Sequence, residues 1–226
     1  MLFLDTANLK EIEDYLKWGC FRGVTTNPKI LQSSGERYSK EAYHKNIRRI
    51  CDLVDGPVSV ELTGSVLNAC DEGATLHRLA DNVVVKVPMW PDGVGMKVIA
   101  LLHEKRIPVN ATVLMKSSQA ILAADAGAEY VSLFYRRMCD YGGLEATKKE
   151  FSTLKEYLKG SSTKIIAGSI RQPIDVVNCL KYGADIVTVP PKNKKYPHLL
   201  WELVNHPKTE ATIAEFDAAW REYTSG

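Results

Sequence analysis

The sequence has no long hydrophobic run, no closely spaced pair of cysteines and almost no net charge. Its 226 residues contain no apolar stretch that approaches membrane-spanning length, and acidic residues stand too early for a signal peptide. Lys and Arg number 29 against 27 Asp and Glu, a net charge of +2, which disfavours nucleic acid or a membrane as a partner. The five scattered cysteines are typical of reduced thiols, so we expect a cytoplasmic protein.

Linkers and a dinucleotide-binding fingerprint are also missing. No tract rich in Pro, Gly or Ser divides the chain, so we predict one domain over residues 1–226. No GxGxxG motif follows the first predicted strand, which disfavours a doubly wound sheet. None of the five histidines stands at a predicted strand end where it could help to build a metal site.

Short apolar runs alternate with amphipathic stretches along the whole chain. The runs predict strands at residues 2–5, 23–26, 58–61, 83–86, 109–112, 130–134, 164–169 and 185–189. Helical patterns separate them, for example at residues 9–19 and 94–106. Eight such units in one chain predict a closed α/β (β/α)8 barrel, a TIM barrel, with an open doubly wound sheet as the alternative. A further C-terminal helix is expected over residues 208–223.

Lys86 interrupts the apolar run VVVKVPM at residues 83–89. Burial in such a strand disfavours an ammonium group and populates the free amine, which is a nucleophile toward carbonyls. The alternative is a lysine that reaches past the strand end into water. We therefore take Lys86 as a candidate for Schiff-base formation.

Polar residues end most of the other predicted strands. A single polar strand end is usually a helix cap or a turn residue. In a parallel barrel, however, the carboxyl ends of all strands surround one mouth. The converging side chains supply an amine, two carboxylates and several neutral hydrogen-bonding groups, which imine chemistry on a hydroxylated carbonyl requires. They are Asp5, Asn27, Glu61, Lys86, Asn110, Thr112, Ser132 and Ser169.

Several motifs resemble those of a known enzyme family. VTTNPKIL (24–31), VVVKVPM (83–89) and IPVNAT (107–112) resemble transaldolases of the short-chain branch, which includes fructose-6-phosphate aldolase. AGAEYVS (126–132), GSIRQP (168–173) and GADIVTVP (183–190) extend the resemblance over almost the entire chain. It implies a (β/α)8 barrel and class I Schiff-base chemistry, with no cofactor and no metal.

The resemblance also implies a role for individual residues. Lys86 matches the imine-forming lysine and Asp5 the acid/base, while Glu61 and Thr112 match the pair that activates water. The positions that hold the donor's hydroxyl groups correspond to Asn27, Asn110 and Ser132. Those that bind the donor's anionic group correspond to Arg137, Ser169 and Arg171. A guanidinium suits a tetrahedral oxyanion, and Arg171 is also expected to follow Ser169 at a helix N-terminus.

Two positions separate transfer from simple cleavage in this family. Glu61 and Phe134 stand where transaldolases carry Glu and Phe, and where the aldolases carry Gln and Tyr. Three residues depart from the usual pattern: Trp90, Lys116 and Arg136. They are expected to add bulk and charge near the acceptor or anion end, although Lys116 and Arg136 could equally be solvated surface.

The predicted function is transfer of a dihydroxyacetone unit from a ketose with an anionic C6 group to an aldose. Fructose 6-phosphate and sedoheptulose 7-phosphate are the expected donors, with the sugar sulfonate 6-deoxy-6-sulfofructose as a third candidate. The same residues are also compatible with a lyase that releases free dihydroxyacetone and with a non-catalytic sugar-phosphate sensor. In the helix at 208–223, Ile213, Phe216, Trp220 and Tyr223 form one apolar stripe. Together with the resemblance, this stripe predicts a homo-pentamer or homo-decamer.

Overall fold

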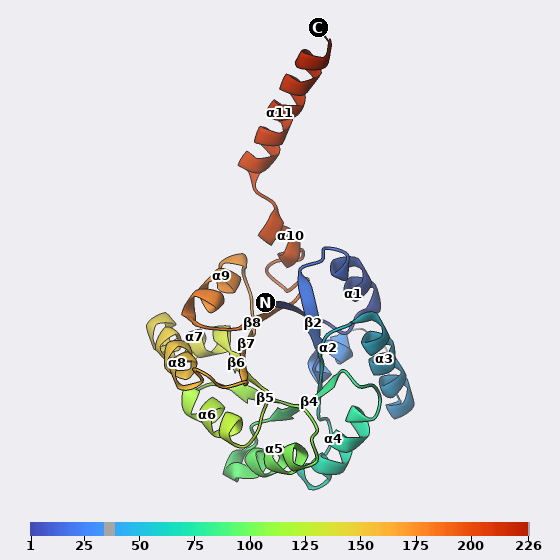
Figure 1. The fold of residues 1–226 in the computed structure, drawn as a ribbon, viewed down its shortest axis with the longest axis vertical. Coiled ribbons are helices and arrows are strands. Elements are labelled where there is room, and N and C mark those ends of the chain that lie inside the picture. The colour runs from blue at the N-terminus through green and yellow to red at the C-terminus, as the bar shows by residue number, and fades with distance from the viewer. Residues whose placement is uncertain (34–38, 226) are drawn as a thin grey trace.

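The chain forms a closed barrel of eight parallel strands, in which β1 pairs with both β2 and β8. The computed structural model describes residues 1–33 and 39–225. The strands follow one another around the barrel in sequence order (Figure 1). This confirms the predicted TIM barrel and excludes the open sheet. The strands are β1 (Leu2–Asp5), β2 (Phe21–Thr25), β3 (Val58–Glu61), β4 (Val83–Pro88), β5 (Val109–Leu114), β6 (Tyr130–Phe134), β7 (Lys164–Gly168) and β8 (Ile186–Val189).

Helices surround the strands, and Figure 1 shows them as an outer ring. The connections from β1 to β7 carry α1 (Leu9–Leu16), α2 (Pro28–Ser33), α3 (Lys40–Leu53), α4 (Ala69–His77), α5 (Val94–Glu104), α6 (Ser117–Asp125), α7 (Tyr135–Gly142) and α8 (Leu144–Tyr157). The remaining helices are α9 (Pro173–Tyr182), α10 (Leu199–Val204) and α11 (Pro207–Ser225). Two short 3₁₀ helices, η1 (Val66–Asn68) and η2 (Pro91–Gly93), precede α4 and α5. No helix in the described part of the chain is both long and apolar enough to cross a membrane.

Two hydrophobic layers hold the barrel together. Alternate strand residues such as Val85 and Val87 face the helices and belong to the large core cluster between strands and helices. A second, smaller cluster of Phe3, Ile166 and Ile186 occupies the opposite strand faces. By the same alternation, Asp5 and Thr188 follow on these inward faces toward the carboxyl end. The barrel interior is therefore apolar at its amino end and polar at its mouth.

Four predicted elements end earlier than expected: the strand predicted at 23–26 ends at Thr25, and the other three end shortly before a residue with a positive φ. The helix expected at 9–19 ends at Leu16, before Gly19 with a φ of 69°. The helix expected at 94–106 ends at Glu104, before Arg106 with a φ of 58°. The strand expected at 164–169 ends at Gly168 because Ser169 has a φ of 61°. Such left-handed backbone cannot continue a helix or a strand.

Helix α11 is present as predicted and extends by one to two residues at each end. In Figure 1 it projects from the barrel, connected through α10. All four residues of its apolar stripe are more than half exposed: Ile213, Phe216, Trp220 and Tyr223. The helix thus leaves a hydrophobic face without cover from its own chain.

Candidate active site

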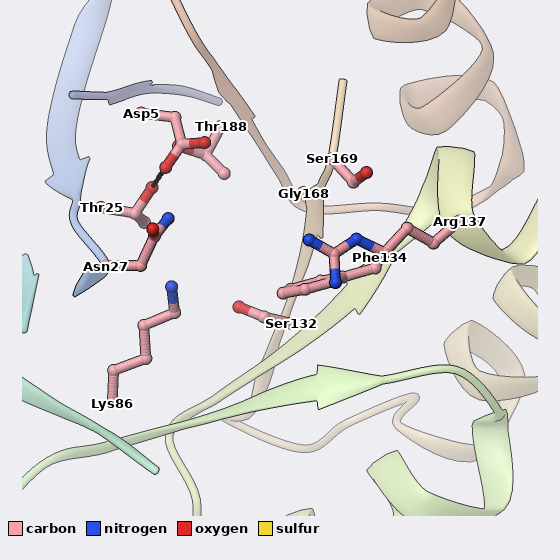
Figure 2. A pocket seen from close by; sticks show the side chains of 10 residues that line it. All are labelled: Asp5, Thr25, Asn27, Lys86, Ser132, Phe134, Arg137, Gly168, Ser169 and Thr188. Carbon is pink, nitrogen blue, oxygen red and sulfur yellow. Dashed lines mark hydrogen bonds between the residues drawn. The ribbon is translucent and has the colours of Figure 1, made fainter. Parts of the chain in front are cut away.

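A pocket opens at the carboxyl ends of the strands, where the predicted site residues meet (Figure 2). Its lining includes most of those residues, among them Asp5, Asn27, Lys86, Ser132, Phe134, Arg137 and Ser169. Glu61 and Arg171 line the wider mouth above it. Asn110 and Thr112 are fully buried on β5. Residues from all eight strand ends therefore contribute to one region, as the barrel topology requires.

Lys86 is buried, but its surroundings differ from those we expected. Its Nζ lies 3.0 Å from Glu61 Oε2 and donates a hydrogen bond of 3.1 Å to the Thr26 carbonyl. Only 6% of the Lys86 side chain is exposed. Glu61 and Lys86 occupy matching positions on the neighbouring strands β3 and β4, which brings both side chains inward together. The amine thus lies against a carboxylate, whereas the valines around it in sequence had suggested apolar surroundings.

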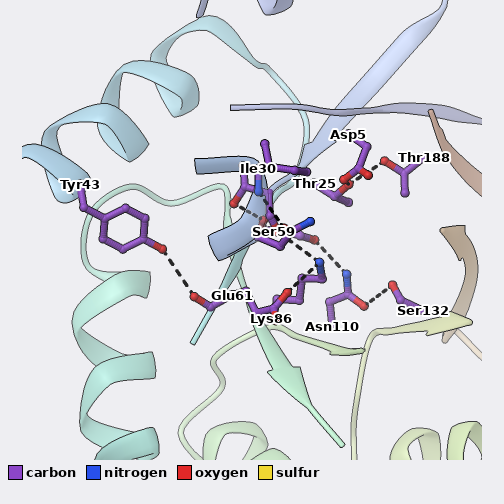
Figure 3. Close-up of polar contacts among 12 residues, drawn as sticks. Asp5, Thr25, Ile30, Tyr43, Ser59, Glu61, Lys86, Asn110, Ser132 and Thr188 are labelled. Atoms are coloured by element: carbon purple, nitrogen blue, oxygen red, sulfur yellow. Dashed lines mark hydrogen bonds and ion pairs between the residues drawn. The ribbon is translucent and has the colours of Figure 1, made fainter. Parts of the chain in front are cut away.

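Asp5 lies at the end of β1 within a short chain of hydroxyl groups. Thr25 Oγ1 donates to Asp5 Oδ1 at 2.8 Å, and it lies 2.6 Å from Thr188 Oγ1 (Figure 3). Burial raises the pKa of the Asp5 carboxyl above its ordinary value. The positive charge of Lys86 and the hydrogen bond from Thr25 act in the opposite direction on this pKa. Asp5 is therefore a carboxyl group suited to exchanging a proton nearer neutral pH than an exposed aspartate.

A second polar chain connects β3, β5 and β6 beside Lys86. Ser132 Oγ donates to Asn110 Oδ1 at 2.7 Å, and Asn110 Nδ2 donates to Ser59 Oγ at 3.1 Å (Figure 3). All three side chains are buried. These bonds fix the orientation of the Asn110 amide, which holds Ser132 in place in the pocket lining from behind.

Thr112 is the one buried side chain in the described residues whose polar atom has no hydrogen-bond partner there. A buried hydroxyl without a partner costs on the order of 1–3 kcal/mol. The next residue, Val113, has a φ of 63°, which is unusual for a β-branched residue, and the pairing of β5 with β6 shifts register at this point. Strain and an unused hydroxyl thus coincide at a predicted catalytic position, as they do at many functional sites.

The cationic side of the pocket lies opposite Lys86 in Figure 2. The Arg137 guanidinium stacks on the Phe134 ring, with its central carbon 4.8 Å from the ring centroid. Arg171 is about half exposed and forms an ion pair of 2.6 Å with Asp140. Lys29, Lys194 and Lys195 add further positive charge to the wide mouth. The arrangement provides an electropositive end for an anionic ligand.

At the helix N-terminus expected to bind an anion, two backbone N–H groups already donate to a side chain of the protein. Helix α9 begins at Pro173, with Gln172 as its N-cap. The backbone N–H groups of Arg171 and Gln172 both donate to Asp175 Oδ2, at 3.0 and 3.1 Å. A carboxylate of the chain itself therefore occupies these donors, and an anion would have to bind through side chains instead.

The three departures from the family pattern have separate structural explanations. Arg136 forms a two-pronged ion pair with the buried Asp175, so it is not a solvated surface residue. Lys116 is exposed before α6 and lines a different groove, which contains Met138 and Tyr141. Trp90 is half-buried against the hydrophobic core. Neither Trp90 nor Lys116 is among the described residues that line the pocket or its mouth.

Some residues of the site were not predicted. Thr25 and Thr188 line the pocket and Ser59 supports Asn110, yet each stands inside a predicted strand and not at its end. Their signal was a polar residue alternating with apolar ones inside a strand, which marks the inward face. No group of three or more His, Cys, Asp or Glu residues in ranges 1–33 and 39–225 is arranged to hold a metal ion.

Comparison with known proteins gives the site its context. Residues 2–225 match the family model described as transaldolase/fructose-6-phosphate aldolase. A probable transaldolase of Thermoplasma acidophilum is 40% identical over 223 residues, covering 97% of this chain and 95% of the relative. One from Methanococcus maripaludis is 38% identical and covers 99% and 98%. The solved thiamine phosphate pyrophosphorylase from Pyrococcus furiosus shares only the fold, with a TM-score of 0.59 and 13% identity over 89% of this chain and 92% of that one.

The contact between Thr25 and Asp5 predicts the effect of removing one hydroxyl. In Thr25→Val the pKa of Asp5 should rise further, because the ionised carboxylate loses a hydrogen bond while its burial remains. Carbon-13 NMR titration of the Asp5 carboxyl would measure the shift. Thr188→Val is the matched control. It removes a hydroxyl that contacts Thr25 and leaves the hydrogen bond from Thr25 to Asp5 in place, so the pKa of Asp5 should change less than in Thr25→Val. An Asp5 pKa that falls or stays constant in Thr25→Val would contradict this account.

Proposed function

The chain belongs to the transaldolase/fructose-6-phosphate aldolase family, and on that premise we propose that it transfers a dihydroxyacetone unit through a Schiff base on Lys86. The observation that carries the proposal is the contact of 3.0 Å between Lys86 Nζ and Glu61 Oε2 inside the pocket mouth. It joins the nucleophile to a group that can accept its proton. The donor would be a fructose-type ketose and the acceptor an aldose.

Imine formation requires proton transfers around Lys86. The Lys86 ammonium gives a proton to Glu61, and the free amine that results attacks the ketose C2 carbonyl. A proton then moves from the nitrogen to the C2 oxygen, which completes the carbinolamine. Loss of the C2 hydroxyl as water then gives the iminium, and Glu61 returns the proton to the departing oxygen. We assign the orientation of this water to the Thr112 hydroxyl on β5, because it is buried and has no hydrogen-bond partner in the described residues. This division of roles follows the family resemblance and is compatible with the observed contacts.

Cleavage of the C3–C4 bond requires a base for the C4 hydroxyl proton, and we assign this role to Asp5. As the base removes that proton, the C4–O bond becomes a carbonyl. The C3–C4 bonding electrons move into the iminium, leaving an enamine on Lys86 and releasing an aldehyde. An acceptor aldehyde then adds to the enamine by the reverse steps. The raised pKa of Asp5 suits both directions, since the same carboxyl must take up and return the proton.

Substrate orientation would fall to the neutral polar groups and to Arg137. Asn27 and Ser132 line the pocket, and Asn110 is held in place behind Ser132, where these groups can bind the donor's hydroxyls. Arg137, with Ser169 and Arg171, would bind the C6 or C7 anion. We propose fructose 6-phosphate or sedoheptulose 7-phosphate as donors. The sulfonate 6-deoxy-6-sulfofructose stays the alternative donor; the charge of Arg136, which contributed to its basis, is balanced by Asp175.

Lys86→Met is expected to abolish turnover and covalent trapping, because no other amine would form the imine. Borohydride with fructose 6-phosphate should add one three-carbon unit to the wild-type protein, and none to Lys86→Met, in intact-mass spectra. Lys116→Met is the matched control and should be trapped like the wild type, since Lys116 lines another groove. Trapping retained in Lys86→Met would assign the imine to another lysine. A wild-type protein that binds the donor without being trapped would support the sensor alternative.

Phe134→Tyr is expected to shift the enzyme toward release of free dihydroxyacetone. Phe134 lies at the pocket wall under Arg137, and a hydroxyl there could deliver a proton or place water near the enamine. The ratio of free dihydroxyacetone to transferred product, measured with a fixed aldose acceptor, should therefore increase. Phe134→Leu provides a control without the hydroxyl. An unchanged ratio in Phe134→Tyr would remove Phe134 as the determinant of transfer.

We further propose that α11 assembles copies of this chain into a ring. Its stripe leaves Phe216 69% and Trp220 65% exposed, and the helix extends away from its own barrel in Figure 1. A surface of this kind in a protein of otherwise ordinary composition marks an interface. A second copy is the natural occupant, since the projecting helix of each copy can reach a neighbour and the contact can repeat around a closed ring. The family resemblance supports a pentamer or decamer.

Truncation before Pro207 should reduce the molar mass measured by light scattering to that of a smaller species. Trp220→Glu should have the same effect, because it places a charge within the apolar stripe. Ala218→Glu adds the same charge on the opposite face of the helix and should leave the assembly intact. A wild-type protein of 25.2 kDa in solution would rule out the ring.

A further inference from the structure

The buried carboxylate of Asp175 gathers four donors from two different connections of the barrel. Arg136 contributes Nε at 2.8 Å and Nη2 at 2.5 Å. The backbone N–H groups of Arg171 and Gln172 contribute the other two, at 3.0 and 3.1 Å. Asp175 has no exposed surface. All four donors lie within hydrogen-bonding distance of its two oxygens, and the reaction proposed above does not use Asp175.

These contacts connect the two segments that form the cationic end of the site, one after β6 and one between β7 and α9. Arg136 is the second residue of α7, between Phe134 and Arg137, which lie in the pocket wall. Asp175 stands in the first turn of α9, behind the segment that carries Ser169 and Arg171. We propose that the Arg136–Asp175 pair is a positioning device that holds these two segments at the spacing needed to bind the anion of the substrate. This inference rests on the proposed function for the identity of that anion.

Several features favour positioning over direct binding by Arg136. Its guanidinium presents two nitrogen atoms to the two Asp175 oxygens, a geometry that fixes the relative orientation of both groups. The charges of the pair cancel, so Arg136 adds little net charge to the mouth. Removing Arg136 would leave the Asp175 carboxylate buried without its counter-charge, which is costly. The pair is thus built to persist when the ligand binds and leaves.

The backbone of Arg171 is held from a second direction as well. Its N–H donates to Asp175, and its carbonyl accepts a hydrogen bond of 3.0 Å from Asn193 Nδ2. The backbone at Arg171 is therefore fixed even though its side chain is about half exposed. A fixed backbone with a mobile charged end restricts where the guanidinium can reach, which suits recognition of one anion position.

Binding of inorganic phosphate tests the proposal without requiring turnover. In Arg136→Gln the dissociation constant, measured by calorimetry, should rise about tenfold, as expected for coupled neighbouring contacts. The KM for fructose 6-phosphate should rise by about the same factor, with kcat within about twofold. Borohydride trapping with dihydroxyacetone, which has no anionic group, should be unchanged. Arg136→Lys retains the charge but not the paired geometry and should recover only part of the affinity.

Lys155→Gln is the matched control at the opposite end of the barrel. Lys155 pairs with Asp185 at 2.5 Å, and Asp185 also accepts a backbone N–H from Ile165. This variant therefore loses a similar ion pair without touching the site, and its phosphate affinity should equal that of the wild type. If Arg136→Gln behaves like this control, the positioning role is wrong.

Asp175→Asn separates positioning from direct binding. It keeps an oxygen for the backbone donors but loses the charge that holds Arg136. A positioning role predicts weaker phosphate binding in Asp175→Asn, as in Arg136→Gln. A direct ligand released from its partner would instead bind phosphate as well as before or more tightly, and that result would overturn the proposal. Weakened phosphate binding in both variants would support the positioning role of the Arg136–Asp175 pair. If the wild type were at the same time not trapped by borohydride, the proposed Schiff-base function would be refuted.

Discussion

The contact between Lys86 and Glu61 depends on the strand register, and the chemistry of the site depends on that contact. Because Glu61 pairs with Lys86 across β3 and β4, the two side chains leave the sheet together on its inner face. Isolated burial would make a charged lysine costly, whereas the carboxylate and the Thr26 carbonyl each accept a contact from Nζ. A shift of one residue would turn Lys86 outward toward the helices, and the pocket would lose its proposed nucleophile.

The same inward alternation divides the barrel into a structural and a chemical end. Phe3 and Ile166 fill the amino end, and Asp5 and Gly168 follow two residues later on the same strands, at the pocket. The apolar layer excludes water beneath the site, which accounts for the raised pKa of Asp5. On the inward face of the same strands, one residue thus packs in the apolar interior and the next inward residue lines the pocket.

Sequence patterns predicted the barrel well because each strand is a short apolar run whose period and spacing are local properties. All eight strands are present, and the errors lie at their ends: β2, β4, β5 and β8 differ from the prediction by one or two residues, and positive φ angles at Arg106 and Ser169 explain two other early ends. Contacts between elements were harder to predict. The burial of Lys86 and its place with Glu61 at one mouth were predicted, but the direct contact between the two side chains depends on strand pairing, which VVVKVPM alone does not encode. Asp175, the partner of Arg136, lies 39 residues away in the sequence. The sequence alone therefore could not show whether Arg136 is a solvated surface residue or part of an ion pair.

The net charge at the pocket mouth therefore depends on which arginines form ion pairs with carboxylates, and the sequence alone does not show these pairs. Arg136 and Arg171 both line the mouth, but each forms an ion pair, with Asp175 and Asp140 respectively, which balances its charge. The guanidinium of Arg137 instead stacks on the ring of Phe134. A paired guanidinium determines geometry, and one held only by an aromatic face remains available to an anion. On this reasoning we propose Arg137 as the principal anion-binding group, with the Arg136–Asp175 pair holding the segments on which Arg137 and Ser169 stand. Recognition of the donor then depends as much on the separation of these segments as on the number of positive charges around them.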